Sequence, residues 1–283
     1  MRYDAGHDSG RDLPAARPPL LASKEYDQAS VFDPQNLLRE ARRQKQLPLV
    51  AIPPMCVLDP DGDIVRHLRR GARARLSPGW ACYHTELYEF DLDGRPVGIV
   101  GCAVGAPFAV LVAEQLFASG CRVLLSITSA GRITEVGRPP YFVLIDRSLR
   151  DEGTSYHYLP PADFVEADPA LVDRAMLVLK AAGPKVLRGA SWTTDAPFRE
   201  TAGAVAGTQA LGILAVEMEA AGLYAFAAAR RKPVLCLAHI TNAMGLVPGD
   251  FDKGEAEGIP DTLTIIGAVI RAIAPDGDQG ASS

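Results

Sequence analysis

The stretch PVGIVGCAVGAPFAVLVAEQLFASGCRVLLSIT, residues 96–128, decides the fold. It begins with an apolar run over residues 96–104 that predicts a strand, and it continues with a helical pattern over residues 106–119. Gly120 follows directly and is the residue type that commonly ends a helix. The apolar run over residues 122–128 is unbroken, which is typical of a strand buried on both faces. A strand, a helix and a strand in this succession predict an α/β protein.

The same alternation extends outward from this unit. Residues 87–92 form a candidate strand, and Asp93-Gly94 after it is a β-hairpin signal. Further upstream, PLVAI at 48–52 is a candidate strand, followed by a turn-rich segment over residues 53–63. Downstream we expect strands at 141–146 and 233–240 and helices at 170–182, 216–229 and 262–273. We therefore expect a three-layer α/β/α domain around a mixed, largely parallel central sheet.

Composition indicates one domain with a small-molecule ligand. The chain has 283 residues, 48% of them hydrophobic, which is enough for a sizeable core. Residues 1–23 and 274–283 are rich in polar residues, Gly and Pro and are expected to be mobile tails around one domain at 24–273. The net charge is -5 and there is no basic block, which argues against non-specific nucleic-acid binding.

Cysteine usage and hydropathy indicate a cytoplasmic protein. The five cysteines form no CxxC pair, which favours a reducing compartment and argues against a zinc site. The N-terminal segment has no apolar core of a signal peptide. No run of about 18 apolar residues predicts a membrane span.

Two small-residue turns are candidate anion sites. GCAVGAP at 101–107 joins a predicted strand to a predicted helix, whose free N–H groups favour an anion; the alternative is a tight turn that needs small residues for packing. SITSAGR at 126–132 places hydroxyl groups at the end of the next strand, where α/β sheets bind ligands; the alternative is a turn that satisfies its own backbone.

Two acidic residues, Glu217 and Glu219, precede an alanine-rich helical segment. On a strand they would share a face, whereas on a helix they would point to different sides. At a strand-to-helix junction, one carboxylate could be structural while the other binds hydroxyl groups of a ligand. The alternative is an acidic helix N-terminus that complements the helix dipole.

Three further segments carry polar and aromatic side chains. RDEGTSYHY at 150–158 and WTTDAPFRE at 192–200 suit flat polar ligands, although surface loops also carry such residues without a binding role. Asn242 follows a predicted strand and offers a donor and an acceptor to a base edge; the alternative is an Asn that caps the strand-end turn.

Together these segments resemble the nucleoside phosphorylase/nucleosidase superfamily, in the branch that contains uridine phosphorylase. The resemblance covers about residues 30–273. VEMEAA at 216–221 resembles the ribose-binding signature of the family, and CAVGAP at 102–107 resembles its phosphate loop. SITSAGRI at 126–133 is similar to its small-residue turn, and RDEGTSYHYLPP at 150–161 and WTTDAPFRET at 192–201 are similar to stretches of its uridine phosphorylase-like members. These five segments occur in the family's order.

The resemblance implies phosphorolysis of a nucleoside, which gives a free base and a sugar 1-phosphate. It implies no metal and no cofactor other than phosphate as co-substrate, and a homo-oligomer, either a dimer or a hexamer. The implied catalytic residues are Glu219 at the ribose hydroxyls and Asn242 at the base. The implied substrate-binding residues are Glu217, Met218, Phe198, Arg199 and Thr241, and the implied phosphate-binding residues are Gly105, Ser126, Ser129 and Arg132.

The sequence departs from the family pattern at the phosphate and at the base. Ser126 stands where the family has a phosphate-binding arginine, and the acidic segment MCVLDPDGD at 55–63 replaces another arginine-bearing loop. Arg132, Arg66 and Arg69 are candidates to replace the lost charge. Asn242 stands where purine-cleaving relatives carry an aspartate, so we expect a pyrimidine base. A hydrolytic nucleosidase and a non-catalytic nucleoside-binding protein are the alternatives.

Overall fold

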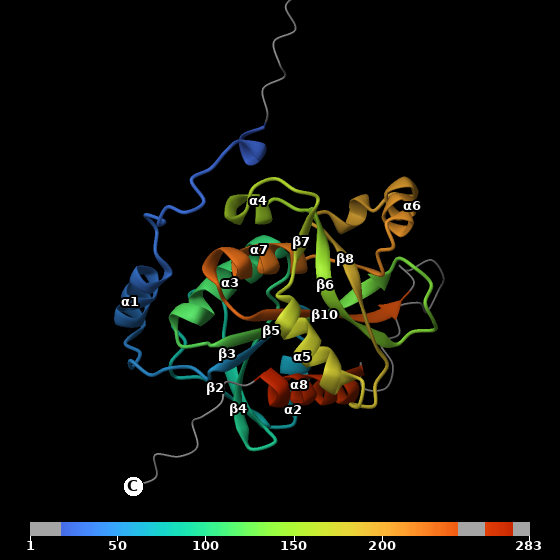
Figure 1. Cartoon of the computed structure of the whole chain (residues 1–283). Helices are drawn as coiled ribbons and strands as arrows, with labels where there is room; N and C mark the ends of the chain where they lie inside the picture. Colours follow the sequence, from blue (N-terminus) through green and yellow to red (C-terminus); the bar gives the residue numbers. More distant parts are fainter. Residues whose placement is uncertain (1–17, 243–257, 274–283) are drawn as a thin grey trace, which may run out of the picture.

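The computed structural model describes residues 18–242 and 258–273 (Figure 1). The tail expected at 274–283 lies outside the described residues, as do residues 1–17 of the tail expected at 1–23. Within residues 18–23 there is a short 3-10 helix, η1 (Pro19–Leu21).

The sheet is mixed and partly closed. Its strands are β1 (Met55–Asp59), β2 (Ala74–Leu76), β3 (Leu87–Leu92), β4 (Arg95–Gly101), β5 (Val123–Arg132), β6 (Tyr141–Asp151), β7 (Phe164–Glu166), β8 (Val186–Thr194), β9 (Ala215–Glu217) and β10 (Val234–Asn242). They follow the order β10-β6-β8-β9-β5-β1-β4-β3-β2, with β7 beside β6. Because β10 also pairs with β5, the strands β5, β10, β6, β8 and β9 form a closed ring. Among the described strands, five pairings are parallel and five antiparallel.

Helices cover both faces of the sheet, as expected for three layers (Figure 1). One face carries α3, α4 and α7, in which α7 packs on α3, and the other carries α2, α5 and α8, in which α5 packs on α8. The helices are α1 (Pro34–Lys45), α2 (Asp63–Arg70), α3 (Ala106–Ala118), α4 (Ser155–Tyr158), α5 (Pro169–Leu179), α6 (Ala202–Ala210), α7 (Ala220–Arg230) and α8 (Ile259–Ile273), with a 3-10 helix η2 (Pro197–Arg199). The strands between the layers are apolar and buried; every residue of β1 and of β10 is buried.

The unit over residues 96–128 folds as expected. β4, α3 and β5 occupy it in order, and β4 joins β3 in the expected hairpin through Asp93-Gly94. Both β4 and β5 pair in parallel with β1, which lies between them. This central position gives β1 a neighbour on each edge and places its C-terminal loop beside the end of β5.

Two sequence predictions of secondary structure are wrong. Residues 48–52 form no strand; Leu49 and Val50 are exposed, and the strand β1 lies instead in the segment predicted as turn-rich. The short run Met55–Asp59 becomes a strand because both of its edges find partners, which is a tertiary effect. The helix predicted over 216–229 begins only at Ala220, because Ala215–Glu217 pair with β5 and β8.

Candidate active site

An open cleft of about 460 Å³ lies where several strands and loops end. It has the position at which α/β sheets bind ligands and the size of a small-molecule site. The β1–α2 loop, the loop after β4, the end of β5, the segment around η2, the β9–α7 junction and the end of β10 line it. Its lining residues are Pro60, Asp61, Val104, Thr128, Ser129, Ala130, Gly131, Pro197, Phe198, Glu200, Val216, Glu217, Met218, Glu219 and Asn242.

Glu219 is the buried carboxylate of this cleft. It is 2% exposed and precedes α7 as the N-cap residue. Its Oε1 accepts a hydrogen bond from the Gly105 N–H at 2.8 Å, whereas its buried Oε2 has no partner among the described residues. Burial and the negative charges of Glu217 and Asp61 raise the pKa of Glu219 to about 8, against the lowering effect of the Gly105 N–H. One oxygen is thus fixed, and the other is free to bind a ligand.

Gly105 provides that fixed contact because of its backbone conformation. It is the N-cap residue of α3 and has a φ of 86°, a region that favours glycine. Its N–H can therefore point at Glu219 across the junction of α3 and α7 rather than into its own helix. Gly105 does not line the cleft itself.

Glu217 is structural. Its Oε2 accepts the N–H groups of Glu219 and Ala220, each at 2.7 Å, and its Oε1 accepts the hydroxyls of Ser191 at 3.0 Å and Thr193 at 2.5 Å. Burial raises the pKa of Glu217, and these four donors oppose the shift. Since each oxygen has two donors, the carboxylate is held at the start of α7 and fixes the backbone of Glu219. The geometry gives Glu217 a structural role, and ligand binding by Glu219 stays a prediction.

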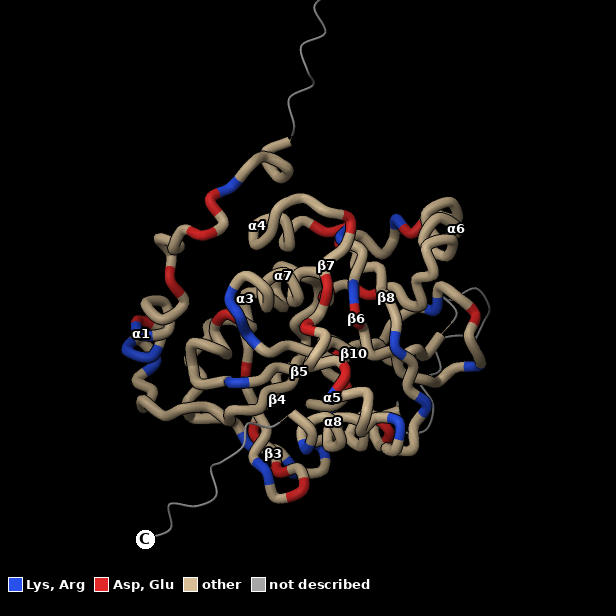
Figure 2. The backbone as a smooth tube through the Cα atoms, in the orientation of Figure 1, with Lys and Arg blue, Asp and Glu red and all other residues tan. Residues whose placement is uncertain are grey.

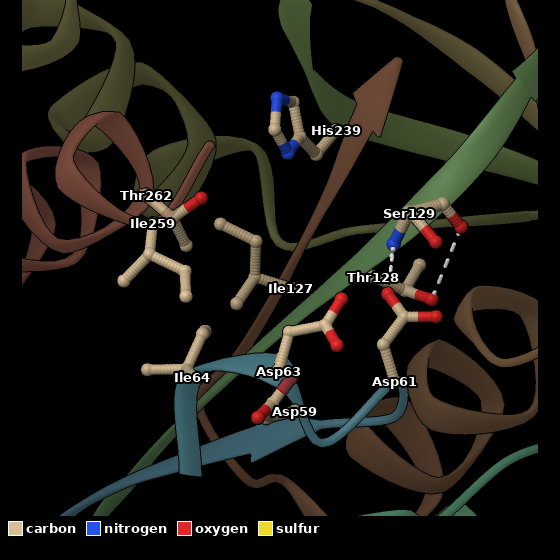
Figure 3. Close-up of a pocket in the computed structure, with 10 residues that line it drawn as sticks. All are labelled: Asp59, Asp61, Asp63, Ile64, Ile127, Thr128, Ser129, His239, Ile259 and Thr262. Atoms are coloured by element: carbon tan, nitrogen blue, oxygen red, sulfur yellow. Dashed lines mark hydrogen bonds between the residues drawn. The ribbon is translucent and has the colours of Figure 1, made fainter. Parts of the chain in front are cut away.

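A narrow cavity of about 20 Å³ adjoins the cleft and is lined by three aspartates (Figure 3). Asp59 is 2% exposed and accepts the N–H groups of Gly62 at 3.1 Å and Val65 at 2.9 Å. Burial raises the pKa of Asp59 to about 7. This residue ties the end of β1 to the first turn of α2, so its role is structural.

Asp61 lines both this cavity and the cleft. Its Oδ2 accepts a hydrogen bond from the Ser129 N–H at 2.8 Å, and Figure 3 shows its carboxylate directed at that residue from the neighbouring loop. Sequence reasoning noticed the acidic segment but assigned no site role to Asp61. The signal was the short apolar run MCVL at 55–58, which is separated from Asp61 only by Asp59 and Pro60 and places Asp61 just after a strand.

The structure brings some of the predicted site residues together and not others. Glu217, Met218, Glu219, Phe198, Ser129 and Asn242 line the cleft, whereas Arg199, Thr241, Ser126, Arg132 and Gly105 do not. Phe198 is 100% exposed, so its ring is available to pack against a ligand in the cleft. Asn242 is 8% exposed, and its Nδ2 donates to the Thr241 Oγ1 at 3.1 Å.

Ser126 and Arg132 do not occupy the phosphate positions expected from the sequence. Ser126 is 2% exposed and lies in the interior of β5, between Leu58 of β1 and Cys236 of β10. Its Oγ is buried without a partner in the described part of the chain. The guanidinium of Arg132 contacts the carbonyl of Gly137 at 3.3 Å and Glu135 at 3.9 Å, in the loop after β5.

The other two candidate arginines are also engaged elsewhere. Arg66 pairs with Asp63, and the guanidinium of Arg69 lies 4.8 Å from the centre of the Tyr88 ring. Within the described part of the chain, no Lys or Arg lines the cleft, while Asp61, Glu200, Glu217 and Glu219 do. Over the molecule, basic and acidic residues are interspersed along the described chain (Figure 2).

Residues 18–242 and 258–273 contain no cluster of three or more His, Cys, Asp or Glu residues placed to hold a metal ion. None of their helices is long and apolar enough to cross a membrane.

The comparison with known families decides the relationship of this chain. A family model described as the phosphorylase superfamily matches residues 57–271. The chain belongs to this superfamily. The matched residues include the β1–α2 loop, both small-residue turns and the β9–α7 junction, so the whole cleft falls within the match. This finding confirms the family resemblance seen in the sequence.

Two sequence relatives and one solved structure that resemble this chain have different names. A purine nucleoside phosphorylase of Myxococcus xanthus is 30% identical over 55% of this chain and 67% of its own length. The uridine phosphorylase of Escherichia coli is 28% identical over 50% of this chain and 61% of its own length. The chain thus spans about two thirds or less of the length of these relatives. The structure of a 5′-methylthioadenosine/S-adenosylhomocysteine nucleosidase from Neisseria meningitidis covers 77% of this chain and 99% of its own, with 16% identity and a TM-score of 0.64. This last likeness confirms the fold alone.

Proposed function

We propose that the protein cleaves the N-glycosidic bond of a nucleoside, and that Glu219 binds the ribose hydroxyls. The observation that carries the proposal is the unpartnered, buried Oε2 of Glu219 at a cleft, beside an Oε1 fixed by Gly105. A fixed carboxylate can accept hydrogen bonds from hydroxyls and stabilise the positive charge that develops on the sugar as the bond breaks. Relatives named as a purine nucleoside phosphorylase and a uridine phosphorylase support the same bond as the target.

The geometry favours water over phosphate as the nucleophile. A phosphate ion would enter a cleft that bears four carboxylates and, among its described lining residues, no Lys or Arg. A neutral nucleophile avoids this repulsion. In the proposed reaction the water oxygen bonds to C1′, and the electron pair of the C1′–N bond leaves on the base. The water releases one proton to solvent and the base takes one up, which gives free base and ribose.

Phosphorolysis, which the resemblance implies, stays a prediction of that resemblance. The homo-oligomer also stays a prediction of the resemblance, and the cytoplasmic location stays a prediction from cysteine usage and hydropathy. We keep the pyrimidine proposal because Asn242 lines the cleft and its carboxamide can donate and accept hydrogen bonds but does not supply a proton. Such a group suits a base that leaves as an anion stabilised by hydrogen bonds.

The direct test is base release from uridine, inosine and adenosine, measured by chromatography in phosphate-free buffer and again with added phosphate. We expect release of uracil at a rate that added phosphate leaves unchanged. Release that requires phosphate would establish phosphorolysis instead. Binding of nucleosides without release of any base, detected by thermal shift, would establish a non-catalytic binding protein.

A further inference from the structure

The wall of the cleft that carries Phe198 is not held in place by burial. It is the segment over residues 195–200 after β8, which contains η2 and contributes Pro197, Phe198 and Glu200 to the lining of the cleft. Four of its six residues are exposed and the other two are half-buried. Because none of these side chains is fully buried, the hydrophobic effect contributes little to the position of the wall, and hydrogen bonds to a neighbouring element must set it.

Asp195 makes the described hydrogen bonds that join this wall to another element. Its Oδ2 accepts the Gly153 N–H at 2.8 Å, and its own N–H donates to the carbonyl of Asp151 at 3.4 Å. The other described hydrogen bonds of residues 195–200 stay within residues 194–201. Both contacts of Asp195 lead to the end of β6 and the turn before α4, and Figure 1 shows α4 at the same end of the molecule as α6, which follows the wall.

The turn that receives these contacts is itself fixed to buried groups. The carboxylate of Asp151 accepts the indole N–H of buried Trp192 at 3.0 Å. Glu152 is 5% exposed, and its Oε2 accepts the Ser155 N–H at 3.0 Å. The turn is therefore a fixed support, and the Asp195 carboxylate attaches the wall to it. A hydrogen bond from a backbone N–H to a carboxylate is among the stronger kinds in proteins.

A wall that is fixed in the free protein favours ligand binding. An unfixed wall would have to be ordered when the ligand binds, and the lost conformational entropy would weaken the affinity. The ring of Phe198 carries no titratable group, so we expect its contact with a base to be the same before and during bond cleavage. Such uniform binding affects KM and leaves kcat unchanged.

We propose that Asp195 is a positioning residue, which acts through the Gly153 N–H to hold the ring of Phe198 at the cleft and so sets the affinity for the nucleoside. The inference rests on the proposed function in that the cleft binds a nucleoside. It goes beyond that function because it assigns a role to a residue that does not itself line the cleft.

The experiment compares the wild type, Asp195→Ala and Asp195→Asn in the base-release assay on uridine. Where the wild type binds uridine without cleaving it, the Kd from equilibrium dialysis replaces KM. In Asp195→Ala we expect KM to rise about three- to tenfold, the size of one hydrogen bond, and kcat to stay within about twofold of the wild type. Asp195→Asn keeps an acceptor oxygen for the Gly153 N–H and should restore most of the affinity.

A double-mutant cycle with Phe198→Ala tests whether Asp195 acts through the ring. Phe198 is fully exposed, so removal of its ring should leave the fold intact. We expect Asp195→Ala to raise KM in the wild-type background and to leave it within about twofold in the Phe198→Ala background. A merely structural role of Asp195 would raise KM by the same factor in both backgrounds.

Asp168→Ala is the matched control. Asp168 is also an exposed aspartate whose carboxylate accepts backbone N–H groups, those of Ala170 at 2.9 Å and Leu171 at 3.3 Å, but it caps α5 and does not line the cleft. This variant loses the same charge and the same kind of contact, so it should lose some stability in thermal melting and keep the wild-type KM. Asp195→Leu, which has a similar shape and no acceptor, replaces Asp195→Ala if the latter is unfolded.

An unchanged KM in Asp195→Ala would overturn the inference, and so would an equal rise in Asp168→Ala or equal effects of Asp195→Ala in the two backgrounds. The two proposals fail separately. If base is released with a KM that Asp195→Ala leaves unchanged, the function stands and the inference fails. If no protein releases base but Asp195→Ala weakens the binding of uridine, the function fails and the inference stands. A wild type that neither binds nor cleaves nucleosides would overturn both.

Discussion

Glu219 holds one oxygen in a fixed contact and leaves the other buried without a partner among the described residues. What these two oxygens can bind depends on the protonation of the carboxyl group. An ionised carboxylate is an acceptor only, whereas a protonated one also donates. Burial, followed by the charge of Glu217, raises the pKa of Glu219 to about 8. Near pH 7 the free protein therefore holds much of this group in the neutral form, which is the weaker acceptor for two ribose hydroxyls.

We expect kcat/KM for nucleoside cleavage to rise with pH, with a midpoint near 8, because the ionised form of Glu219 is the one that accepts both hydroxyls. The sign follows from the raised pKa: below pH 8 the proton is on and the hydroxyl contacts weaken. In Glu219→Gln we expect kcat/KM to fall about 10- to 100-fold, the size of hydrogen bonds to a charged group, and the pH dependence to disappear. Rate measurements from pH 6 to 9.5 test this.

Glu200→Gln is the control for this pH profile, since Glu200 also lines the cleft but makes no contact with Gly105 among the described hydrogen bonds. It should keep the rise with pH. An unchanged profile in Glu219→Gln would show that another group titrates, and Glu219 would then lose its proposed role.

At the level of the elements, a buried hydroxyl cluster connects β6 and β8 to the start of α7. Ser148 on β6 contacts the hydroxyls of Ser191 at 2.8 Å and Thr193 at 2.7 Å, both on β8. Thr193 also accepts the Ala221 N–H at 2.9 Å and donates to Glu217. Because Glu217 in turn fixes the backbone of the next acidic residue, the alignment of β8 with α7 sets the position of the site.

Thr193→Val removes this central hydroxyl while keeping the side-chain shape. The Ala221 N–H and one oxygen of Glu217 then lose a buried partner, so we expect the free energy of unfolding to fall by about 1–3 kcal/mol. Thr193→Ser keeps the hydroxyl and should lose less. Guanidinium denaturation of the three proteins measures the difference; equal stability of Thr193→Val and the wild type would mean that the cluster is energetically neutral.

The elements with a clear pattern could be predicted from sequence, and those that depend on distant partners could not. The unit from β4 to β5 follows its hydrophobic periodicity, so its strands and helix fall where expected. β1 has only five residues and becomes a strand because β4 and β5 pair on its two sides. β9 has only three residues, and the sequence predicts a helix from its second residue onward. It forms a strand because β5 and β8 pair on its two sides.

The candidate site divides in the same way. The pair Glu217 and Glu219 could be singled out because the residue types and the junction are visible in the sequence. The direction of a long side chain is not visible there: Arg132 is the last residue of the expected turn, yet its guanidinium contacts the carbonyl of Gly137. The contact of the Asp61 carboxylate with the Ser129 N–H depends on β1 and β5 lying side by side, a pairing between residues far apart in the chain.

Over the whole molecule, the cleft depends on how two helices of one layer pack. α3 begins after Gly105 and α7 begins after Glu219, so the hydrogen bond between these residues spans the two helix starts. The helices approach closely because α7 carries Gly222 against Ala106 of α3; a Cβ at position 222 would lie 2.7 Å from the Ala106 Cβ. The packing of α7 on α3 therefore also sets the distance between Gly105 and Glu219 at the site.

Gly222→Ala should push the two helix starts apart. The added methyl group meets Ala106 and, at 3.3 Å, Val110 of the same helix, so the helices must separate or shift. We expect a loss of about 1–3 kcal/mol in the free energy of unfolding, as for overpacked cores. We also expect a lower kcat/KM under conditions where the protein is fully folded, because the Gly105–Glu219 contact lengthens.

Gly207→Ala in α6 is the matched control: position 207 is exposed with nothing within 4 Å of an added Cβ, so this variant should be as stable as the wild type or more so. Unchanged stability and activity in Gly222→Ala would show that the two helices yield without cost, and that the position of Glu219 is set by β9 and the hydroxyl cluster alone.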